Sequence, residues 1–261
     1  MLFRSQGSYL INPNRTSDIV IASTEGGYVT VPVSPEDFGF PPLKRNYYSL
    51  ELFMEHPFDG KWYGKIDYVY SRSYGNTEGQ VRSDIGQSDV SATEDWDFGP
   101  LMAYANGYQG NDHTHALKVY GYYQIAPEWT VSGNLLIQSG APRSCLGYYG
   151  TDINDPQDPA GYGDSYHFCD GVPSRPGDAG RNPFVKNLAL SVEYRPLWAG
   201  KKLAFDLDVF NVLNQQVKLQ TYPFYGGQGG YEPSYGRALG VAPNYGYTAP
   251  RSMRVGVRYD Y

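Results

Sequence analysis

The sequence predicts an all-β fold, namely an antiparallel transmembrane β-barrel segment of about eight strands. Stretches of about ten residues alternate apolar and polar side chains, which gives a strand one apolar and one polar face. The connections between these stretches alternate between short turns and long loops. Outer-membrane barrels combine both features, with short periplasmic turns, longer extracellular loops and apolar side chains that face lipid.

The alternation is clearest in the last eleven residues, 251–261. One face of this stretch carries Met253, Val255, Val257, Tyr259 and Tyr261. The other face carries Ser252, Arg254, Gly256, Arg258 and Asp260. A helical period would mix the arginines with the valines, so this stretch is predicted to be a strand. The chain stops on an aromatic residue, as outer-membrane barrel proteins characteristically do, and we expect barrel-assembly machinery to engage this C-terminal strand.

The same alternation predicts seven further strands upstream. They are expected near Gly7–Asn12 and at Leu43–His56, Lys61–Ser73, His113–Ile125, Trp129–Gly140, Phe184–Pro196 and Lys201–Asn214. A loop region, Pro13–Pro42, precedes the second of them, and within it Ile19–Ala22 and Tyr28–Val33 could form a small hairpin around Glu25, Gly26 and Gly27.

The connections orient the strands. Pro57–Gly60 is a tight turn, because proline fixes φ and glycine accepts a positive φ. Short turns are also expected at 126–128 and 197–200, whereas the loops at Tyr74–Asp112, Ala141–Asn182 and Gln215–Ala249 are long and polar. If Tyr261 ends in the periplasm, the short turns are periplasmic and the long loops are extracellular.

Composition fits a barrel and excludes a helical membrane protein. No apolar run approaches the eighteen residues of a membrane-spanning helix. The 26 tyrosines suit the two interfaces between membrane and water, where an apolar ring with a hydroxyl can be half wet. The net charge of −6 argues against a nucleic-acid partner. Outer-membrane lipid is the expected partner of the apolar strand faces.

Charged residues on the polar faces are expected to point into the lumen and to pair across neighbouring strands. They are Lys65, Asp67, Glu193, Arg195, Asp206, Asp208, Arg254 and Arg258. We interpret them primarily as structural ion pairs and secondarily as part of a solute pathway.

Two cysteines, Cys145 and Cys169, lie in one stretch rich in Gly, Pro and Asp. Their spacing fits no zinc pattern, and a disulfide that closes an extracellular loop in an oxidising compartment is the preferred interpretation. Residues Met1–Ser8 contain no charged stretch followed by an apolar run, so no secretory signal is recognised.

Two polar clusters invite a functional interpretation. Asp112, His113 and His115 have no nucleophile nearby in sequence, and we interpret them as the junction between a loop and a strand. A second cluster consists of Asp152, Asn154, Asp155, Asp158 and Asp164. It lacks the glycine and terminal glutamate of an EF-hand, so a solvated acidic loop is preferred to a calcium site. No catalytic, cofactor-binding or metal-binding residue is predicted, and a hydrolase would need a Ser, His and carboxylate constellation that the sequence does not assemble.

Several segments carry a family resemblance. They are YSRSYGNTEG at 70–79, NDHTHALKVYG at 111–121, QSGAP at 138–142, DLDVFNVLN at 206–214 and PRSMRVGVRYDY at 250–261. Together they resemble the C-terminal barrel region of TonB-dependent outer-membrane receptors, particularly the Oar-like branch, over roughly Leu43–Tyr261.

The resemblance implies an integral barrel of the Gram-negative outer membrane. Such receptors look like a barrel of about 22 strands closed by a plug domain, and they import scarce nutrients with energy from the TonB complex. This sequence contains no recognisable plug, so the TonB complex would act only through a domain absent here. We therefore expect 1–261 to be the C-terminal part of a larger barrel and to form an open curved sheet in isolation.

An alternative stays open at the level of sequence. Eight strands could close into a self-contained outer-membrane barrel that serves as a surface binding or adhesion protein. An interior that narrow must be filled by side chains, and the lumen charges could pair into such a core.

Overall fold

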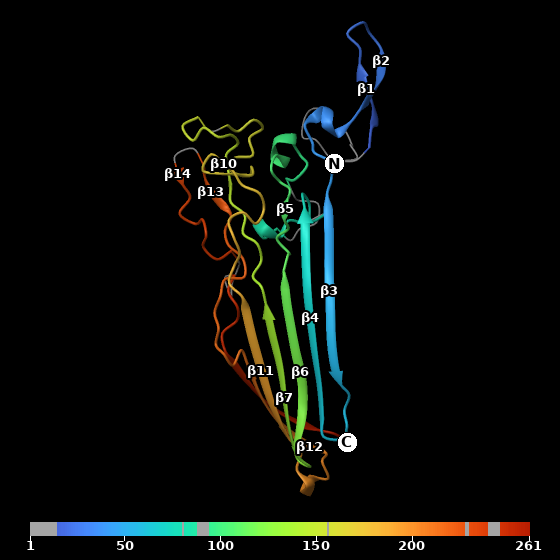
Figure 1. Ribbon diagram of the computed structural model, residues 1–261, viewed down its shortest axis with the longest axis vertical. Coiled ribbons are helices and arrows are strands. Elements are labelled where there is room, and N and C mark those ends of the chain that lie inside the picture. Colours follow the sequence, from blue (N-terminus) through green and yellow to red (C-terminus); the bar gives the residue numbers. More distant parts are fainter. Residues whose placement is uncertain (1–14, 80, 88–93, 156, 228–229, 240–245) are drawn as a thin grey trace.

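The chain forms one long antiparallel sheet with folded loops at one end (Figure 1). The computed structural model describes residues 15–79, 81–87, 94–155, 157–227, 230–239 and 246–261. The sheet has eight strands, and seven follow one another in the order β15-β12-β11-β7-β6-β4-β3. Their bounds are β3 Arg45–His56, β4 Trp62–Gly75, β6 His115–Ala126, β7 Trp129–Gln138, β11 Val185–Tyr194, β12 Leu203–Phe210 and β15 Ser252–Tyr259.

These bounds confirm the strands expected from Leu43 onward, with ends shifted by a few residues. The strand expected near Gly7–Asn12 lies outside the described residues. The eighth strand of the sheet is instead β5, Gly107–Tyr108, which pairs with Tyr74 and Gly75 at the upper end of β4. It lies within the segment expected to be a loop, where no period-two pattern marks it.

The strand register joins the apolar residues into one continuous face. Ile66 of β4 lies opposite Val119 of β6, which lies opposite Leu135 of β7 and then Leu188 of β11. On the other side of β11 the same face continues through β12 to Met253, Val255 and Val257 of β15. Side chains on one face of a strand recur every second residue, so this register places an apolar surface across all seven strands.

The opposite face of the sheet is polar. Across its middle, Ser132, Ser191, Asp208 and Arg254 stand side by side on four successive strands. The predicted separation of an apolar from a polar face is therefore confirmed across these four strands.

The short turns are built to be compact. In the turn after β3, Asp59 Oδ1 accepts hydrogen bonds from the backbone N–H groups of Lys61 and Trp62 at 2.9 and 3.0 Å. Gly60 in the same turn has a φ of 94°, which glycine adopts without a steric cost. The other two turns contact each other, because the N–H of Leu197 donates to Glu128 Oε1 at 2.6 Å.

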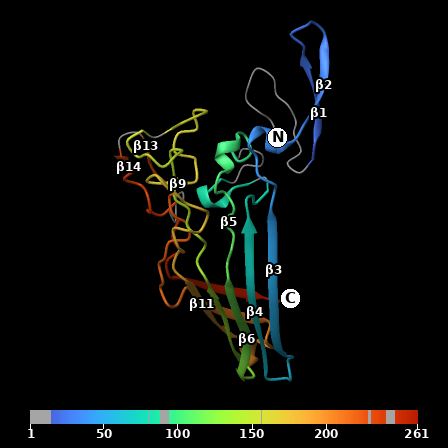
Figure 2. The same ribbon diagram turned by 45° about the horizontal axis from the view of Figure 1, so that its top comes forward.

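The long connections gather at the end of the sheet opposite these turns (Figure 2). They contain the short strands β8 Leu146–Gly147, β9 Phe168–Cys169, β10 Val172–Pro173, β13 Phe224–Gly227 and β14 Gly230–Tyr231. They also contain two of the four short 3-10 helices of the described residues, η2 Ser83–Ile85 and η3 Gly99–Met102; the other two are η1 Pro35–Phe38 and η4 Leu197–Ala199.

The small hairpin expected around Glu25 is confirmed as β1 Ser17–Ala22 and β2 Tyr28–Val33, which projects beyond the loops. Within the described part of the chain, no helix is both long enough and apolar enough to cross a bilayer.

The sheet is open. β3 and β15 are its two ends in the pairing order, and each has one long strand as its neighbour. Among the residues that the structure describes, no strand pairs with the outer edge of either one, so both edges present backbone donors and acceptors without a strand partner.

The contact between the two turns can be tested. We expect Glu128→Ala to lower the free energy of unfolding in detergent by about 1 kcal/mol, because Leu197 loses a charged acceptor. Glu128→Gln keeps an acceptor and is the matched control. Urea titration and amide exchange at Leu197 measure the effect, and equal values for the two variants would contradict it.

Candidate functional site

The described parts of the three long loops, 76–114, 139–184 and 211–251, pack together into what we call the cap. At its centre lies Arg82, whose side chain is buried. Its Nε lies 2.9 Å from Asp84 Oδ1, and its Nη1 lies 2.9 Å from Asp95 Oδ1. Buried charges are costly unless they are paired and hydrogen-bonded, so these contacts hold the first loop in one conformation.

The Arg82 cluster also joins the loops to one another. Asp84 Oδ2 accepts a hydrogen bond of 2.6 Å from the hydroxyl of Ser144, which belongs to the second loop. From the third loop, the side-chain amide of Gln220 donates to the carbonyl of Ser83 at 2.8 Å. One short segment, 82–84, therefore contacts both of the other loops.

The cluster sets the charge states of its members. Burial opposes ionisation of Asp84, but the Arg82 guanidinium and the Ser144 hydroxyl outweigh it and lower the pKa of this carboxyl. Burial raises the pKa of Asp95, although Arg82 partly offsets the effect. Arg82 stays protonated, because both carboxylates act against the cost of its burial and raise its pKa.

His167 of the second loop lies against this cluster, and its side chain is 3% exposed. Burial and the nearby Arg82 charge lower its pKa from 6.5 to about 3, so the imidazole is neutral at physiological pH. Its Nδ1 has no hydrogen-bond partner within the described residues. It shares with Arg82, Asp84 and Asp95 a cavity of about 20 Å³, which has room for one water molecule.

Apolar packing also supports the cap. Leu101 packs with Tyr166 and Phe168, which brings together the first and second loops. Phe40 and Trp96 stack with ring centroids 5.9 Å apart and tie the first loop to the segment before β3. β8 of the second loop pairs in parallel with β13 of the third.

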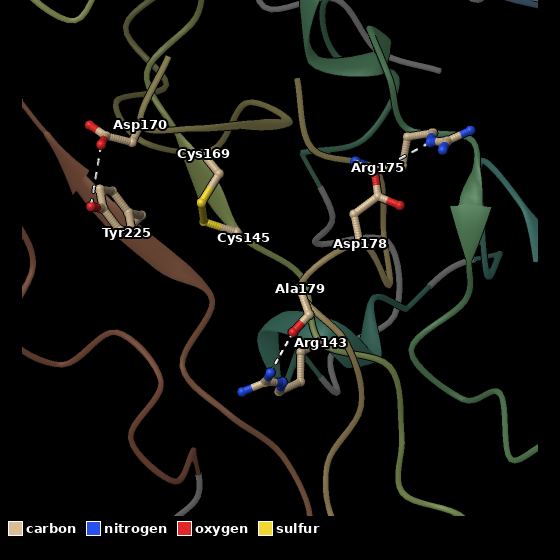
Figure 3. Close-up of a disulfide and its surroundings, with 8 residues drawn as sticks. All are labelled: Arg143, Cys145, Cys169, Asp170, Arg175, Asp178, Ala179 and Tyr225. Carbon is tan, nitrogen blue, oxygen red and sulfur yellow. Dashed lines mark hydrogen bonds and ion pairs between the residues drawn. A yellow bond between two sulfur atoms is a disulfide. The ribbon is translucent and has the colours of Figure 1, made fainter. Parts of the chain in front are cut away.

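The two cysteines lie within the cap (Figure 3). The structure joins Cys145 and Cys169 by a disulfide that closes a segment of 24 residues within the second loop, with the Cα atoms 5.3 Å apart. Cys145 precedes β8 and Cys169 ends β9, so the bond joins the residue before β8 to a strand whose Phe168 packs with Leu101 and Tyr166. Beside it, the hydroxyl of Tyr225 donates to Asp170, a further contact between the second and third loops.

The cluster around Asp112 lies where the cap meets the sheet. Asp112 is buried and forms an ion pair with Arg181 of the second loop. His113 Nδ1 lies 2.7 Å from the carbonyl oxygen of Ser139. His115 instead lies beside Tyr68, with 2.8 Å between its Nδ1 and the tyrosine hydroxyl. These contacts support the interpretation as a junction between loop and strand.

The acidic residues of the second loop serve local structure. Asp158 accepts hydrogen bonds from the backbone of Tyr162 and Gly163 and from the hydroxyl of Tyr166. Asp152 accepts one from the N–H of Asn154. Among the described residues, no three His, Cys, Asp or Glu side chains are grouped as metal ligands would be.

The charges of the polar face form pairs in two directions. Arg254 lies 2.8 Å from Asp208 on the neighbouring strand, as expected for pairing across strands. Lys65 and Asp67, however, pair along β4 at 3.3 Å, which corrects the expectation of cross-strand pairing for these two residues. Neighbours two residues apart share a face, so a long lysine can reach along its own strand.

Near the short turns the pairs join into a network. Glu193 accepts a hydrogen bond from Arg195 at 2.8 Å, and this pair again does not cross strands. Glu193 also accepts a hydrogen bond from Arg258 of β15 at 3.1 Å, with β12 between the two strands. Arg195 and Arg258 both reach Asp260 as well. Asp206 shares this face through its register with Glu193 and Gly256.

Sequence reasoning missed the centre of the cap. Arg82, Asp95 and His167 lie in stretches without periodicity, and nothing in their spacing indicates that they meet. The only available signal was the length of the loops, since long loops in a compact structure usually have a function.

The neutral state of His167 predicts a pH dependence of the cap. The pKa of about 3 in the folded chain lies below the ordinary 6.5, so between these values the unfolded cap binds more protons than the folded one. The free energy of unfolding of the cap should fall as the pH decreases from about 6.5 toward 4, by up to a few kcal/mol. Amide exchange at Leu146 and Phe168 measures it.

The control for this prediction is His167→Gln, which cannot take up a proton. Asp84 has a lowered pKa, so it decreases the stability of the folded cap only below its ordinary pKa of 3.8. Asp95 has a raised pKa, so its protonation increases the stability of the folded cap as the pH decreases. Both are retained in the variant, so the difference between the two proteins isolates His167. The same slope in both proteins between pH 4 and 6.5 would contradict the prediction.

The disulfide leads to a second testable prediction for the cap. In the chain-entropy account, closing 24 residues stabilises the cap by about 3 to 4 kcal/mol. We expect a Cys145→Ala/Cys169→Ala double variant to lose stability of this order in the cap while the sheet keeps its exchange protection. Alkylation in non-reducing buffer should label neither cysteine, and labelling of both would refute the bond.

Comparison with known proteins identifies a relative. No protein-family model matches the chain. The TonB-dependent transporter Oar of Myxococcus xanthus is 30% identical in a match of length 254, and the match covers 85% of this chain and 23% of the relative. The chain thus spans about a quarter of the length of the curated relative that it matches.

Among solved structures, the outer membrane transporter YddB from Escherichia coli superposes with a TM-score of 0.49 at 12% identity, covering 94% of this chain and 28% of that one. The relative is a transporter rather than an enzyme, in agreement with the sequence prediction.

Proposed function

Because the chain is homologous to part of a TonB-dependent transporter, we propose that it forms a section of the barrel wall, with its extracellular cap, in a TonB-dependent outer-membrane receptor. The observation that carries the proposal is the continuous apolar face across seven strands, backed by a polar face. Lipid covers the apolar face, and the polar face lines the lumen.

The open edges support a section of a larger wall. A backbone group without a partner costs several kcal/mol in lipid, so neither edge is tolerated in a membrane. Closure of the seven long described strands into a barrel of their own would need pairing between β3 and β15, and these strands lie at opposite ends of the order. In our proposal, further strands of the receptor pair with both edges, and 1–261 is the C-terminal part of its barrel.

The one-sided loops support the orientation. The three short turns face the periplasm, and the cap faces the medium, where it is the first part of this section that an incoming solute meets. The nutrient would pass the polar face, whose charges are largely neutralised by one another. Barrel-assembly machinery would engage β15, and the TonB complex would act through a plug domain of the receptor.

Protease added to intact cells tests the proposal. In the receptor that carries this chain, cleavage should occur in the cap at its exposed segments, and Pro57–Gly60 should be spared. The receptor should also fractionate with the outer membrane and change its mobility on a gel when it is heated. Cleavage confined to the short turns would reverse the orientation, and a receptor that is absent from the outer membrane would refute the proposal.

Neighbouring residues on β7 provide a test of the two faces. Leu135 belongs to the apolar face, and Asn134 belongs to the polar face. We expect Leu135→Arg to lower folding stability in a bilayer by about 2 to 4 kcal/mol, because the charge enters lipid. Asn134→Arg, the matched control, should cost much less, and similar costs would contradict the assignment of the faces.

A further inference from the structure

Three glycines interrupt the apolar face in one row across three neighbouring strands. Gly64 of β4 lies opposite Gly121 of β6, which lies opposite Gly133 of β7. Without side chains the surface falls to the level of the backbone. Two adjoining hollows result, of about 690 and 260 Å³, and Gly121 and Gly133 line both of them.

Apolar side chains form the two walls of this hollow. Ile66, Val119 and Leu135 lie on one side of the glycine row, and Trp62, Tyr123 and Val131 lie on the other. The larger volume falls within the range of about 300 to 1,000 Å³ that is typical of ligand pockets.

One end of the row is covered by the chain itself. The Trp62 ring lies over Gly64, where a Cβ would come within 2.9 Å of it, and stacks on His56 with ring centroids 3.7 Å apart. An aromatic ring over a strand glycine is a common way to cover exposed backbone. Gly121 and Gly133 are left to line the open part of the hollow.

The surrounding backbone excludes a side chain at Gly121 but not at Gly133. A Cβ on Gly121 would lie 2.3 Å from the carbonyl oxygen of Tyr63, so close strand packing alone demands glycine there. At Gly133 the nearest atom is the flexible end of Leu190 at 3.3 Å, and the backbone φ is not positive. The fold does not require glycine at 133, and the effect of its missing side chain is to keep the hollow open.

The surroundings indicate what fills the hollow. The residues that line the hollow are mainly apolar. This inference rests on the proposed function, in which the sheet face that contains the hollow contacts lipid. A void there would lose dispersion contacts, which an acyl chain restores. Lys61, an exposed residue of the short turn, places its ammonium 5.3 Å from the centre of the Tyr123 ring, beside the smaller hollow.

The short turn also contains a carboxylate, Asp59. It is engaged by the backbone N–H groups of Lys61 and Trp62 and lies 3.9 Å from His56. The Lys61 ammonium is therefore the group of this turn that is placed to meet an anionic headgroup at the membrane interface.

We propose that this hollow binds one anionic phospholipid of the periplasmic leaflet, with an acyl chain along Gly121 and Gly133 and the phosphate at Lys61. The Lys61 ammonium, the Tyr123 ring and the apolar hollow follow one another in the same order as the headgroup, the interfacial region and the acyl chain of such a lipid.

Native mass spectrometry of the receptor released from bilayers of defined composition tests this proposal. With phosphatidylglycerol the wild type should retain one lipid, about fivefold more often than with phosphatidylcholine, since one lysine contacts the headgroup. Gly133→Phe, which fills the hollow, should lose this retention. Lys61→Gln should retain both lipids equally.

Leu207→Phe is the matched control, because it adds an aromatic ring to the same apolar face away from the hollow and should leave retention unchanged. Gly133→Ala, a smaller change, should lower retention partially and covers the case in which the phenylalanine variant does not fold. Wild-type retention of both lipids to the same extent, or Gly133→Phe retaining phosphatidylglycerol as the wild type does, would overturn the proposal. Cross-linking of a second protein chain through position 133 would also overturn the proposal, because a protein would then occupy the hollow.

These results are separable from a failure of the proposed function. A receptor that fractionates with the outer membrane and shifts on heating, yet retains no phosphatidylglycerol, refutes the lipid site alone. A receptor that fails both of those tests refutes the proposed function, and the lipid site with it.

Discussion

The antiparallel register of the sheet is the constraint on which the other features depend. A slip of one residue between any two strands would move every side chain of one strand to the opposite face. The register that pairs Ile66 with Val119 and Leu135 also aligns Gly64 with Gly121 and Gly133, and it brings Asp208 beside Arg254 on the other side. The apolar face, the hollow in it and the polar face therefore follow from one set of backbone hydrogen bonds.

The cap is held by a different kind of interaction. Arg82 is buried with two carboxylates, and removal of any one partner would leave a charge without compensation in a poorly hydrated interior. Such a cluster favours a single arrangement of the loops over many partial ones. The disulfide and the aromatic packing of Tyr166 and Phe168 also restrict the second loop. In the proposed receptor, a cap held in this way would present the same shape to each incoming solute.

The two faces of the sheet have opposite demands in the proposed receptor. The polar face must stay hydrated without binding a passing solute tightly, and charges that pair with one another, such as Glu193 with Arg258, meet this demand. The apolar face must leave no gap against lipid. At Gly121 close strand packing forces a gap, and the proposed phospholipid fills it together with the space left at Gly133.

The sequence by itself determined the seven long strands of the sheet, the alternation of their side chains between two faces and the short turns. Period-two alternation and residues such as Gly60 act over neighbouring residues, so a local reading is sufficient for them. Only the tertiary structure decided that Arg82, Asp95 and His167 meet, because loops without a period bring distant residues together through packing. It also decided that Lys65 pairs along its own strand with Asp67, and that three glycines from separate strands align. Both outcomes depend on side-chain reach and inter-strand register, which no single strand encodes.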